Sequence, residues 1–198
     1  MEKVKVIIMG LGAMGGGMAD MLLKKQGVEI VGVVGRGKML GTSMYDHIST
    51  PRGDREDVVV GAMEDVITEK AADVVLLCTD SFTRKAFDKI KFIVEKKINV
   101  ISSAEEMAYP MAQEPELAKE IDRLAKENGV SVLGTGINPG LIMDLLVILM
   151  TGCCEEVHSI LSRRVNSLSP FGPAVMEEQG IGITVEEFNK GVQEGTLA

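Results

Sequence analysis

Residues 4–17 read VKVIIMGLGAMGGG, a short apolar run that ends in glycines. Gly10, Gly12 and Gly15 have the spacing G-x-G-x-x-G, which is typical of the junction between a buried strand and a helix. Here Gly10 permits the tight turn, Gly12 lets the backbone approach a ligand, and Gly15 lets the helix pack against the strand. Because the N-terminus of a helix binds phosphate groups, this stretch predicts a dinucleotide site.

The residues around the glycines support this interpretation, since a glycine triplet alone is a weak signal. Residues 4–8 are rich in β-branched side chains, residues 14–25 carry apolar side chains at helical spacing, and residues 28–34 form a second apolar run. The chain therefore starts with a strand, a glycine turn, a helix and a strand.

The same alternation continues along the chain. We expect strands at 58–60, 73–77, 98–101 and 130–133, and helices at 64–70, 82–96 (with Phe82, Ala86, Ile90, Ile93 and Val94 on one face) and 115–128. Alternating strands and helices build a Rossmann-type doubly wound parallel sheet, which we assign to residues 1–140 as a dinucleotide-binding domain.

The pattern changes after residue 140. Residues 141–150 form a strongly apolar helix, and residues 156–165 alternate in the way expected for an antiparallel strand. We therefore expect residues 141–198 to be the incomplete beginning of a second, α+β domain for substrate binding or dimerisation.

Composition excludes several functional classes. The 198 residues carry a net charge of −8 and only scattered Lys and Arg, which argues against nucleic acid as a partner. No apolar stretch reaches the roughly 18 residues that a membrane span needs, and the start does not resemble a signal peptide, so we expect a cytoplasmic protein. The three cysteines suit reduced thiols, and the two histidines lack metal-ligand spacing to a cysteine, so no metal site is expected.

The predicted cofactor site lies at the carboxyl ends of the strands, where parallel sheets bind their ligands. These ends are glycine-rich or polar. The residues that we expect to contact the cofactor are Gly10, Gly12, Ala13, Met14, Gly15, Arg36, Lys38, Cys78, Thr79, Ser81, Ser102 and Ser103.

The end of the second strand chooses between NAD and NADP. An acidic residue there would bind the ribose hydroxyls of NAD, but this chain has Gly35-Arg36-Gly37-Lys38 instead. Arg36 can pair with a 2′-phosphate, which favours NADP, with NAD also usable. The alternative is that Arg36 and Lys38 belong to a solvated loop.

The candidate catalytic residues are Glu105, Glu106 and Asn138. A carboxylate near the nicotinamide can receive a substrate ammonium or its proton, and Asn138 lies on a turn that Pro139 and neighbouring glycines constrain. We expect His158 to be a packed or surface residue and the pair Cys153-Cys154 to be structural.

Several of these segments together resemble one enzyme family. GLGAMG, TDSFTRKAF, SSAEEMAYP, GTGINPG and SRRVNSLSPFGPAVMEEQG are similar to 2,4-diaminopentanoate dehydrogenase, within the wider group of dihydrodipicolinate reductase-like proteins. The resemblance implies oxidative deamination of 2,4-diaminopentanoate at C4 by NAD or NADP, giving 2-amino-4-oxopentanoate and ammonia in ornithine fermentation. It also implies a homodimer for the complete protein, and members that continue beyond the point where this chain stops.

Two other functions stay open at this level. A dihydrodipicolinate reductase-like imine reductase would use the same glycine turn, but it would have a histidine and lysine grouping that the residues after His158 do not match. A non-catalytic NAD(P) sensor would share the fold, because a fold alone does not fix a function.

Overall fold

The computed structural model describes residues 2–165, 167, 176–177, 179–194 and 197. The chain divides into two compact units, residues 1–158 and 159–198, and each is described by itself below.

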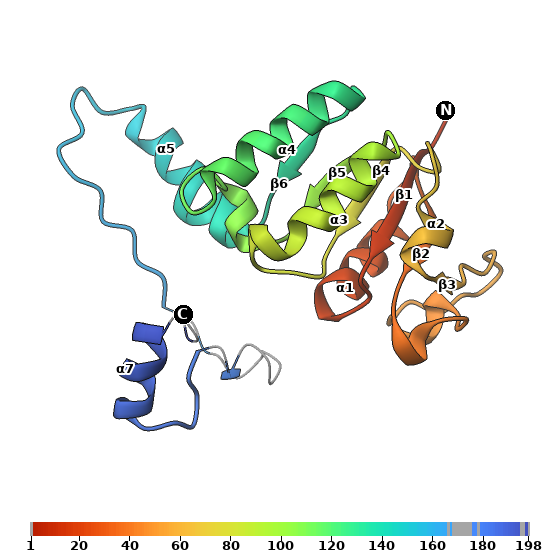
Figure 1. Ribbon diagram of the computed structural model, residues 1–198, viewed down its shortest axis with the longest axis horizontal. Helices are drawn as coiled ribbons and strands as arrows, with labels where there is room; N and C mark the ends of the chain where they lie inside the picture. Colours follow the sequence, from red (N-terminus) through yellow and green to blue (C-terminus); the bar gives the residue numbers. More distant parts are fainter. Residues whose placement is uncertain (1, 166, 168–175, 178, 195–196, 198) are drawn as a thin grey trace. The chain divides into compact units, whose positions relative to one another are not determined.

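The first unit is built on a six-stranded parallel sheet in the order β3-β2-β1-β4-β5-β6 (Figure 1). Its strands are β1 (Val4–Met9), β2 (Val28–Val34), β3 (Val60–Gly61), β4 (Val74–Leu77), β5 (Asn99–Ser102) and β6 (Val132–Gly134). The order reverses between β1 and β4, which are neighbours although β2 and β3 separate them in sequence. The predicted doubly wound, Rossmann-type sheet is therefore confirmed.

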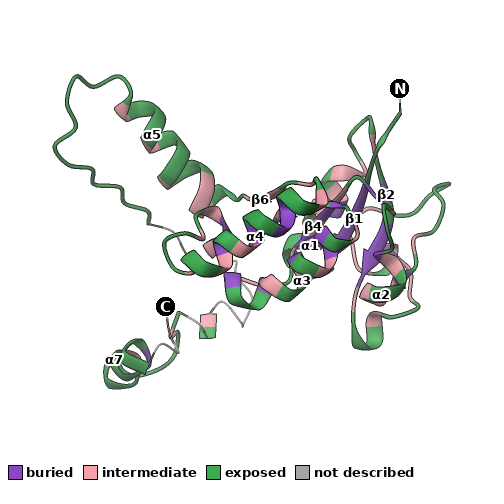
Figure 2. Cartoon of the chain, turned by 45° about the horizontal axis from the view of Figure 1, so that its top comes forward, coloured by how far each residue is buried: buried purple, intermediate pink, exposed green. Residues whose placement is uncertain are grey.

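Helices cover both faces of this sheet. The helices are α1 (Ala13–Leu22), α2 (Met63–Val66), α3 (Thr83–Glu95) and α4 (Pro115–Asn128). Alternate residues of β1 enter two separate cores: Ile7 packs in the core that contains α3 and α4, and Ile8 packs in the core that contains α1 and Met44. Figure 2 shows the buried residues gathered on the strands and on the inner faces of the helices.

Helix α4 follows the predicted pattern at both ends. Pro115 occupies the first turn, and Gly129 ends the helix in the left-handed conformation with φ +66°. In α3 the predicted apolar face is buried except at one position. Phe82 was expected on that face, but it lies at the N-cap, 42% exposed, with the Lys85 ammonium 5.0 Å from its ring centroid.

Three short single-turn segments connect the larger elements. These are η1 (Gly37–Met39) and η2 (Met44–Asp46), which lie between β2 and β3, and η3 (Glu105–Ala108), which follows β5. Met44 is fully buried and anchors the long β2–β3 connection in the core.

The last helical part of the first unit is η4 (Ile137–Leu145) followed by α5 (Leu146–Thr151). Its start is irregular, because Asn138, Pro139 and Gly140 have non-helical backbone angles. Most of its large apolar side chains are exposed, and Ile148, Leu149 and Met150 are each more than 60% exposed. The expected apolar helix is present, without a buried face of its own.

The antiparallel strand predicted for residues 156–165 is wrong. These residues have no regular secondary structure, and Leu161 and Val165 are 77% and 96% exposed. An alternating sequence becomes a strand only when another strand takes up its backbone hydrogen bonds, and none of the described residues does so.

The second unit contains α7 (Val185–Glu194), a helix that was not predicted. The Thr184 amide donates to the Glu187 carboxylate (2.8 Å), and the Glu187 amide donates to the Thr184 hydroxyl (3.3 Å). This reciprocal pair is a capping box, which the spacing Thr184-x-x-Glu187 could have revealed. Within the described residues, no helix is long and apolar enough to cross a membrane.

Candidate functional site

The glycine turn between β1 and α1 has the geometry of a phosphate cradle. Gly10 has φ +97°, a value that favours glycine, and its amide donates to the Val34 carbonyl (2.9 Å). A Cβ built on Gly15 would lie 1.8 Å from the Gly10 oxygen, so only glycine lets α1 approach the turn this closely.

The open side of this turn fits a dinucleotide. A Cβ built on Gly12 meets no atom within 4 Å, so a side chain there would occupy the space in front of the helix N-terminus that the backbone leaves free. Ala13 and Met14, the first helical residues, are exposed at the same end. The amides of this turn can therefore bind a pyrophosphate, which is the expected role.

The carboxyl end of β4 lies beside the turn, at the point where the strand order reverses. A Cβ built on Gly10 would lie 2.7 Å from the Thr79 Cγ2 atom, so the Thr79 methyl group packs against the turn. The Thr79 hydroxyl donates to the Asp80 carboxylate (2.5 Å), and the Lys89 ammonium donates to the same oxygen (2.6 Å). Asp80 and Lys89 were not among the predicted site residues, because no motif predicts a pair nine residues apart between a loop and a helix.

Cys78 is partly buried between the turn and α1. Its Sγ lies 3.5 Å from the Met18 sulfur, and burial raises the pKa of the Cys78 thiol. A thiol in such surroundings stays protonated at neutral pH, which suits a packing role at the cofactor site.

The predicted serines differ in how far they are buried and in which groups they hydrogen-bond. Ser102 is fully buried, and its hydroxyl accepts from the Ala104 amide (3.2 Å). The Ser103 hydroxyl donates to the Leu77 carbonyl (3.4 Å), and the Ser81 carbonyl accepts from the Glu106 amide (3.1 Å). Ser81 and Ser103 are half-buried and remain available at the strand ends.

The end of β2 presents positive charge without a carboxylate. Arg36 and Lys38 are exposed, and their side chains make no hydrogen bond or ion pair with the described residues. The connection that follows is held in place: Asp20 of α1 accepts from the Ser49 and Thr50 amides (3.1 and 2.7 Å). The loop that carries the two cations is thus tethered at its far end.

The two candidate carboxylates have different environments. Glu106 accepts from the Thr83 amide (2.9 Å) and so caps α3, joining the β4–α3 loop to the segment after β5. Glu105, its neighbour, is exposed and has no partner among the described residues. The geometry therefore leaves Glu105 as the carboxylate that is free to meet a substrate, and gives Glu106 a structural task.

Asn138 lies after β6, in the segment that leads into α5. It precedes a cis peptide bond to Pro139, and it is half-buried. The next turn is closed by Asp144, whose carboxylate accepts from the Gly140 amide (2.7 Å). Asn138 thus follows the last strand of the sheet, as predicted.

The other polar candidates are surface residues. His158 is 85% exposed and lies 3.4 Å from the Glu156 carboxylate, and Cys153 and Cys154 are both exposed. The described residues contain no cluster of three or more groups that could hold a metal ion. Much of the NSLSPFGPAV segment, residues 166 and 168–175, lies outside the described residues.

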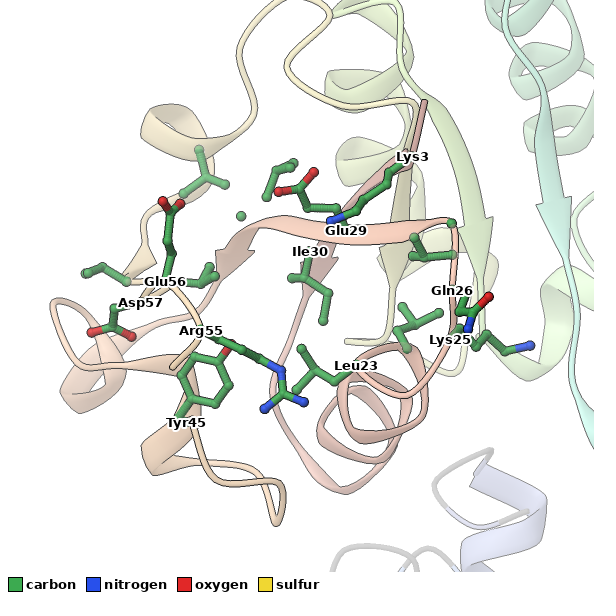
Figure 3. A pocket seen from close by; sticks show the side chains of 18 of the residues that line it. Lys3, Leu23, Lys25, Gln26, Glu29, Ile30, Tyr45, Arg55, Glu56 and Asp57 are labelled. Atoms are coloured by element: carbon green, nitrogen blue, oxygen red, sulfur yellow. The ribbon is translucent and has the colours of Figure 1, made fainter. Parts of the chain in front are cut away.

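A groove of about 920 Å³ lies elsewhere, along the first half of β2 (Figure 3). On the side away from β1, β2 pairs only through Val33 and Val34, so its earlier residues form an open edge. Ile30, Tyr45 and Arg55 line this edge, and the Arg55 guanidinium donates to the Pro51 and Arg52 carbonyls. Because the groove is remote from the strand carboxyl ends, it is not the predicted cofactor site.

Comparisons with solved structures agree with this geometry. An amine dehydrogenase from Mycobacterium smegmatis matches with 27% identity and a TM-score of 0.75, over 96% of this chain and 56% of that one. A meso-dapdh variant from Clostridium tetani E88, determined with DAP, matches with 18% identity and a TM-score of 0.57, over 76% of this chain and 42% of that one. GenD2 from gentamicin A biosynthesis, in complex with NAD, matches with 21% identity and a TM-score of 0.52, over 68% and 34%. The last two likenesses concern the fold alone, and this chain spans little more than half the length of the amine dehydrogenase.

Family models cover nearly the whole chain. Residues 141–198 match the 2,4-diaminopentanoate dehydrogenase C-terminal domain, which confirms the resemblance found in the sequence. Residues 4–135 match the oxidoreductase family with an NAD-binding Rossmann fold. The glycine turn, the sheet and these matches show that the chain belongs to this NAD-binding oxidoreductase family and is similar to 2,4-diaminopentanoate dehydrogenase.

Proposed function

We propose that the protein catalyses the NAD(P)-dependent oxidative deamination of 2,4-diaminopentanoate at C4: a hydride leaves C4 for the cofactor, and water hydrolyses the resulting imine to 2-amino-4-oxopentanoate and ammonia. The observation that carries this proposal is the match of residues 141–198 to the 2,4-diaminopentanoate dehydrogenase C-terminal domain, directly after a nucleotide-binding sheet. The likeness to an amine dehydrogenase supports the same reaction class, oxidation of a carbon that bears an amino group. The bound nicotinamide supplies the hydride acceptor.

The chain's own residues have the following roles in the proposal. Glu105 receives the ammonium group of the substrate and takes its proton, because it is the free carboxylate after β5. Asn138 holds a polar group of the substrate from the neighbouring strand end. Glu106 keeps the β4–α3 loop in place through the Thr83 amide.

We further propose that NADP is preferred over NAD. No acidic residue occurs between Gly35 and Tyr45, and Arg36 is exposed and unpaired among the described residues. An arginine at this place suits a 2′-phosphate, whereas binding of the free ribose hydroxyls would need a carboxylate.

Reduction of NADP and of NAD, measured with 2,4-diaminopentanoate, ornithine, lysine and diaminopimelate in parallel, tests the substrate and the cofactor together. Turnover with 2,4-diaminopentanoate alone is the expected result. Turnover with another amine would contradict the substrate. Dinucleotide binding without turnover of any amine would favour the sensor, and reduction of a cyclic imine by NADPH would favour the imine reductase.

Glu105→Gln tests the assigned carboxylate. We expect the variant to lose at least about a hundredfold in kcat, since general acid–base groups contribute roughly that much, while its dinucleotide affinity stays unchanged. Glu116→Gln makes the same charge change on an exposed residue of α4 and serves as the control. A Glu105→Gln variant as active as wild type would remove Glu105 from the reaction.

Arg36→Asp tests the cofactor preference. NADPH affinity should fall by at least about tenfold, the effect of losing one charged contact, while NADH affinity changes little or improves. Lys91→Asp, an exposed change of equal charge in α3, controls for the overall field. An equal loss of NADPH and NADH affinity would contradict the role given to Arg36.

The homodimer implied by the resemblance is likewise a proposal. Static light scattering on the purified protein measures the mass directly, and a mass equal to one chain at micromolar concentration would contradict it.

A further inference from the structure

A three-residue chain of contacts joins α3 to the edge of the cofactor site. The Lys89 ammonium and the Thr79 hydroxyl both donate to Oδ2 of Asp80, at 2.6 and 2.5 Å. The Asp80 side chain is 11% exposed and that of Lys89 is 31% exposed, whereas Thr79 lies at the surface. The Asp80 carboxylate is thus mostly shielded from water, and Thr79 is the member of the three that lies at the surface beside the phosphate turn.

This arrangement fixes which hydrogen-bonding capacity Thr79 has left. A threonine hydroxyl has one proton and two lone pairs. A carboxylate accepts only, so the contact with Asp80 uses the single Thr79 proton. The Lys89 ammonium, 2.6 Å from Oδ2, holds the Asp80 carboxylate in position and pairs its charge.

Thr79 also has a defined place along the ligand. Its methyl group packs against Gly10 of the phosphate turn. β2, whose end binds the adenosine ribose in this fold, lies on one side of β1, and β4 lies on the other. Thr79 therefore faces the half of a dinucleotide that carries the nicotinamide.

We propose that Asp80 and Lys89 are positioning residues that make Thr79 an obligate hydrogen-bond acceptor for a donor group on the nicotinamide riboside, a ribose hydroxyl or the carboxamide NH2. Phosphate oxygens only accept, so Thr79 does not bind the pyrophosphate. The inference rests on dinucleotide binding by this family and not on the identity of the amine substrate.

Dissociation constants of the purified protein for NADPH, ADP-ribose and ADP, measured by calorimetry, test the inference. Thr79→Val removes the hydroxyl and keeps the shape. We expect it to weaken NADPH binding roughly three- to tenfold, the usual effect of one neutral hydrogen bond, and to leave ADP binding unchanged. Thr79→Ser should restore NADPH affinity. A loss with ADP-ribose as well as NADPH assigns the ribose hydroxyl, and a loss with NADPH alone assigns the carboxamide.

The positioning role is tested by Asp80→Asn alone and combined with Thr79→Val. If Asp80 acts through Thr79, the double variant binds NADPH no more weakly than Thr79→Val does. Glu69→Gln, which breaks the exposed Lys97–Glu69 pair with the same charge change, should not alter NADPH affinity. Melting temperatures report whether Asp80→Asn is folded, and Thr79→Val tests the acceptor role independently if it is not.

Three results would overturn the inference: unchanged NADPH affinity of Thr79→Val, an equal loss of ADP affinity, or independent and multiplying effects of the two substitutions. Failure of the wild-type protein to bind NADPH or NADH is a different outcome, because it would contradict dinucleotide binding itself.

Discussion

Helix α4 and the segment 137–151 are both helical, but α4 buries its apolar side chains whereas 137–151 leaves most of them exposed. In α4, Ile121 and Leu124 are buried against the sheet, and Arg123 on the outer face pairs with Glu120 and Glu127. In 137–151 most of the large apolar residues are exposed, and the segment forms no salt bridge with other described residues.

The difference shows what each kind of sequence needs. An amphipathic helix obtains its stability from one buried face and places its charges in water. A helix that is apolar on most sides requires cover on most sides, and the described part of the first unit supplies little. The two regions should therefore respond differently to the same substitutions.

The largest expected difference is between Ile121→Asp and Ile148→Asp. Ile121 is 6% exposed, so a charge there should lower the free energy of unfolding by more than about 4 kcal/mol. Ile148 is 67% exposed, so its change should stay within about 0.5 kcal/mol. Urea denaturation followed by circular dichroism measures both. Equal destabilisation would show that α5 is covered in solution.

Thiol accessibility extends the comparison to the end of β4 and to the residues after α5. Burial raises the pKa of Cys78 in the sheet region, whereas Cys153 and Cys154, after α5, are exposed. With a disulfide reagent at pH 8, two thiols should react quickly and the third at least about tenfold more slowly. Cys78→Ala should remove only the slow phase. Three equal rates would mean that the packing around Cys78 opens readily.

A smaller effect is expected from two aspartates that accept from backbone amides, Asp20 of α1 and Asp144 of the segment 137–151. The Thr50 hydroxyl, followed by the Ser49 and Thr50 amides, lowers the pKa of Asp20 below its ordinary value of 3.8. A depressed carboxyl pKa contributes stability above 3.8 that is lost as the pH falls through the lowered value. Asp20→Ala should therefore lower the melting temperature at pH 7, and the difference from wild type should shrink below pH 3.8.

Asp144→Ala is the matched control, because Asp144 accepts from Gly140 within the exposed segment. Its melting temperature should stay close to that of wild type at either pH. A shift as large as that of Asp20→Ala would indicate that 137–151 unfolds together with the sheet.

The smallest expected effect comes from the charges on the outer face of α4. Arg123→Ala removes exposed ion pairs, and such pairs contribute little and are screened by salt. The melting temperature should fall slightly at low ionic strength and not measurably at high salt. A loss that persists in high salt would point to packing of the arginine stem instead.

The sequence predicts the sheet well because its longer strands and helices carry their own apolar period. The short α2 departs from the prediction, because a helix was expected at 64–70 and α2 ends at Val66. Phe82 departs as well: its spacing matches the buried face of α3, but the helix begins one residue later. The predicted strand 156–165 was wrong because alternating apolar and polar residues indicate a strand with one apolar face, but they do not supply the neighbouring strand that it must pair with. The opposite error occurred at α7, where the Thr184-x-x-Glu187 signature was present and overlooked.

The candidate site was predictable at positions where the backbone geometry allows only one residue type, glycine. Gly10 and Gly15 fulfil the roles that their spacing assigns. The sequence could not show which of the neighbouring residues Glu105 and Glu106 has a free carboxylate, because this depends on the Thr83 amide of a separate helix. The Asp80–Lys89 pair could not be predicted either, because it joins a loop to a helix in the folded chain.

The central place of β1 has a consequence for how the phosphate turn behaves before any ligand arrives. At the end of β1 the Gly10 amide donates to Val34 of β2, and the Met9 carbonyl accepts from Cys78 after β4. Hydrogen bonds therefore join the turn to the strands on both sides, and it should already have its binding conformation in the free protein. Ligand binding then costs little chain entropy, and the Gly10 amide should rank among the slowest to exchange with deuterium whether or not a dinucleotide is present.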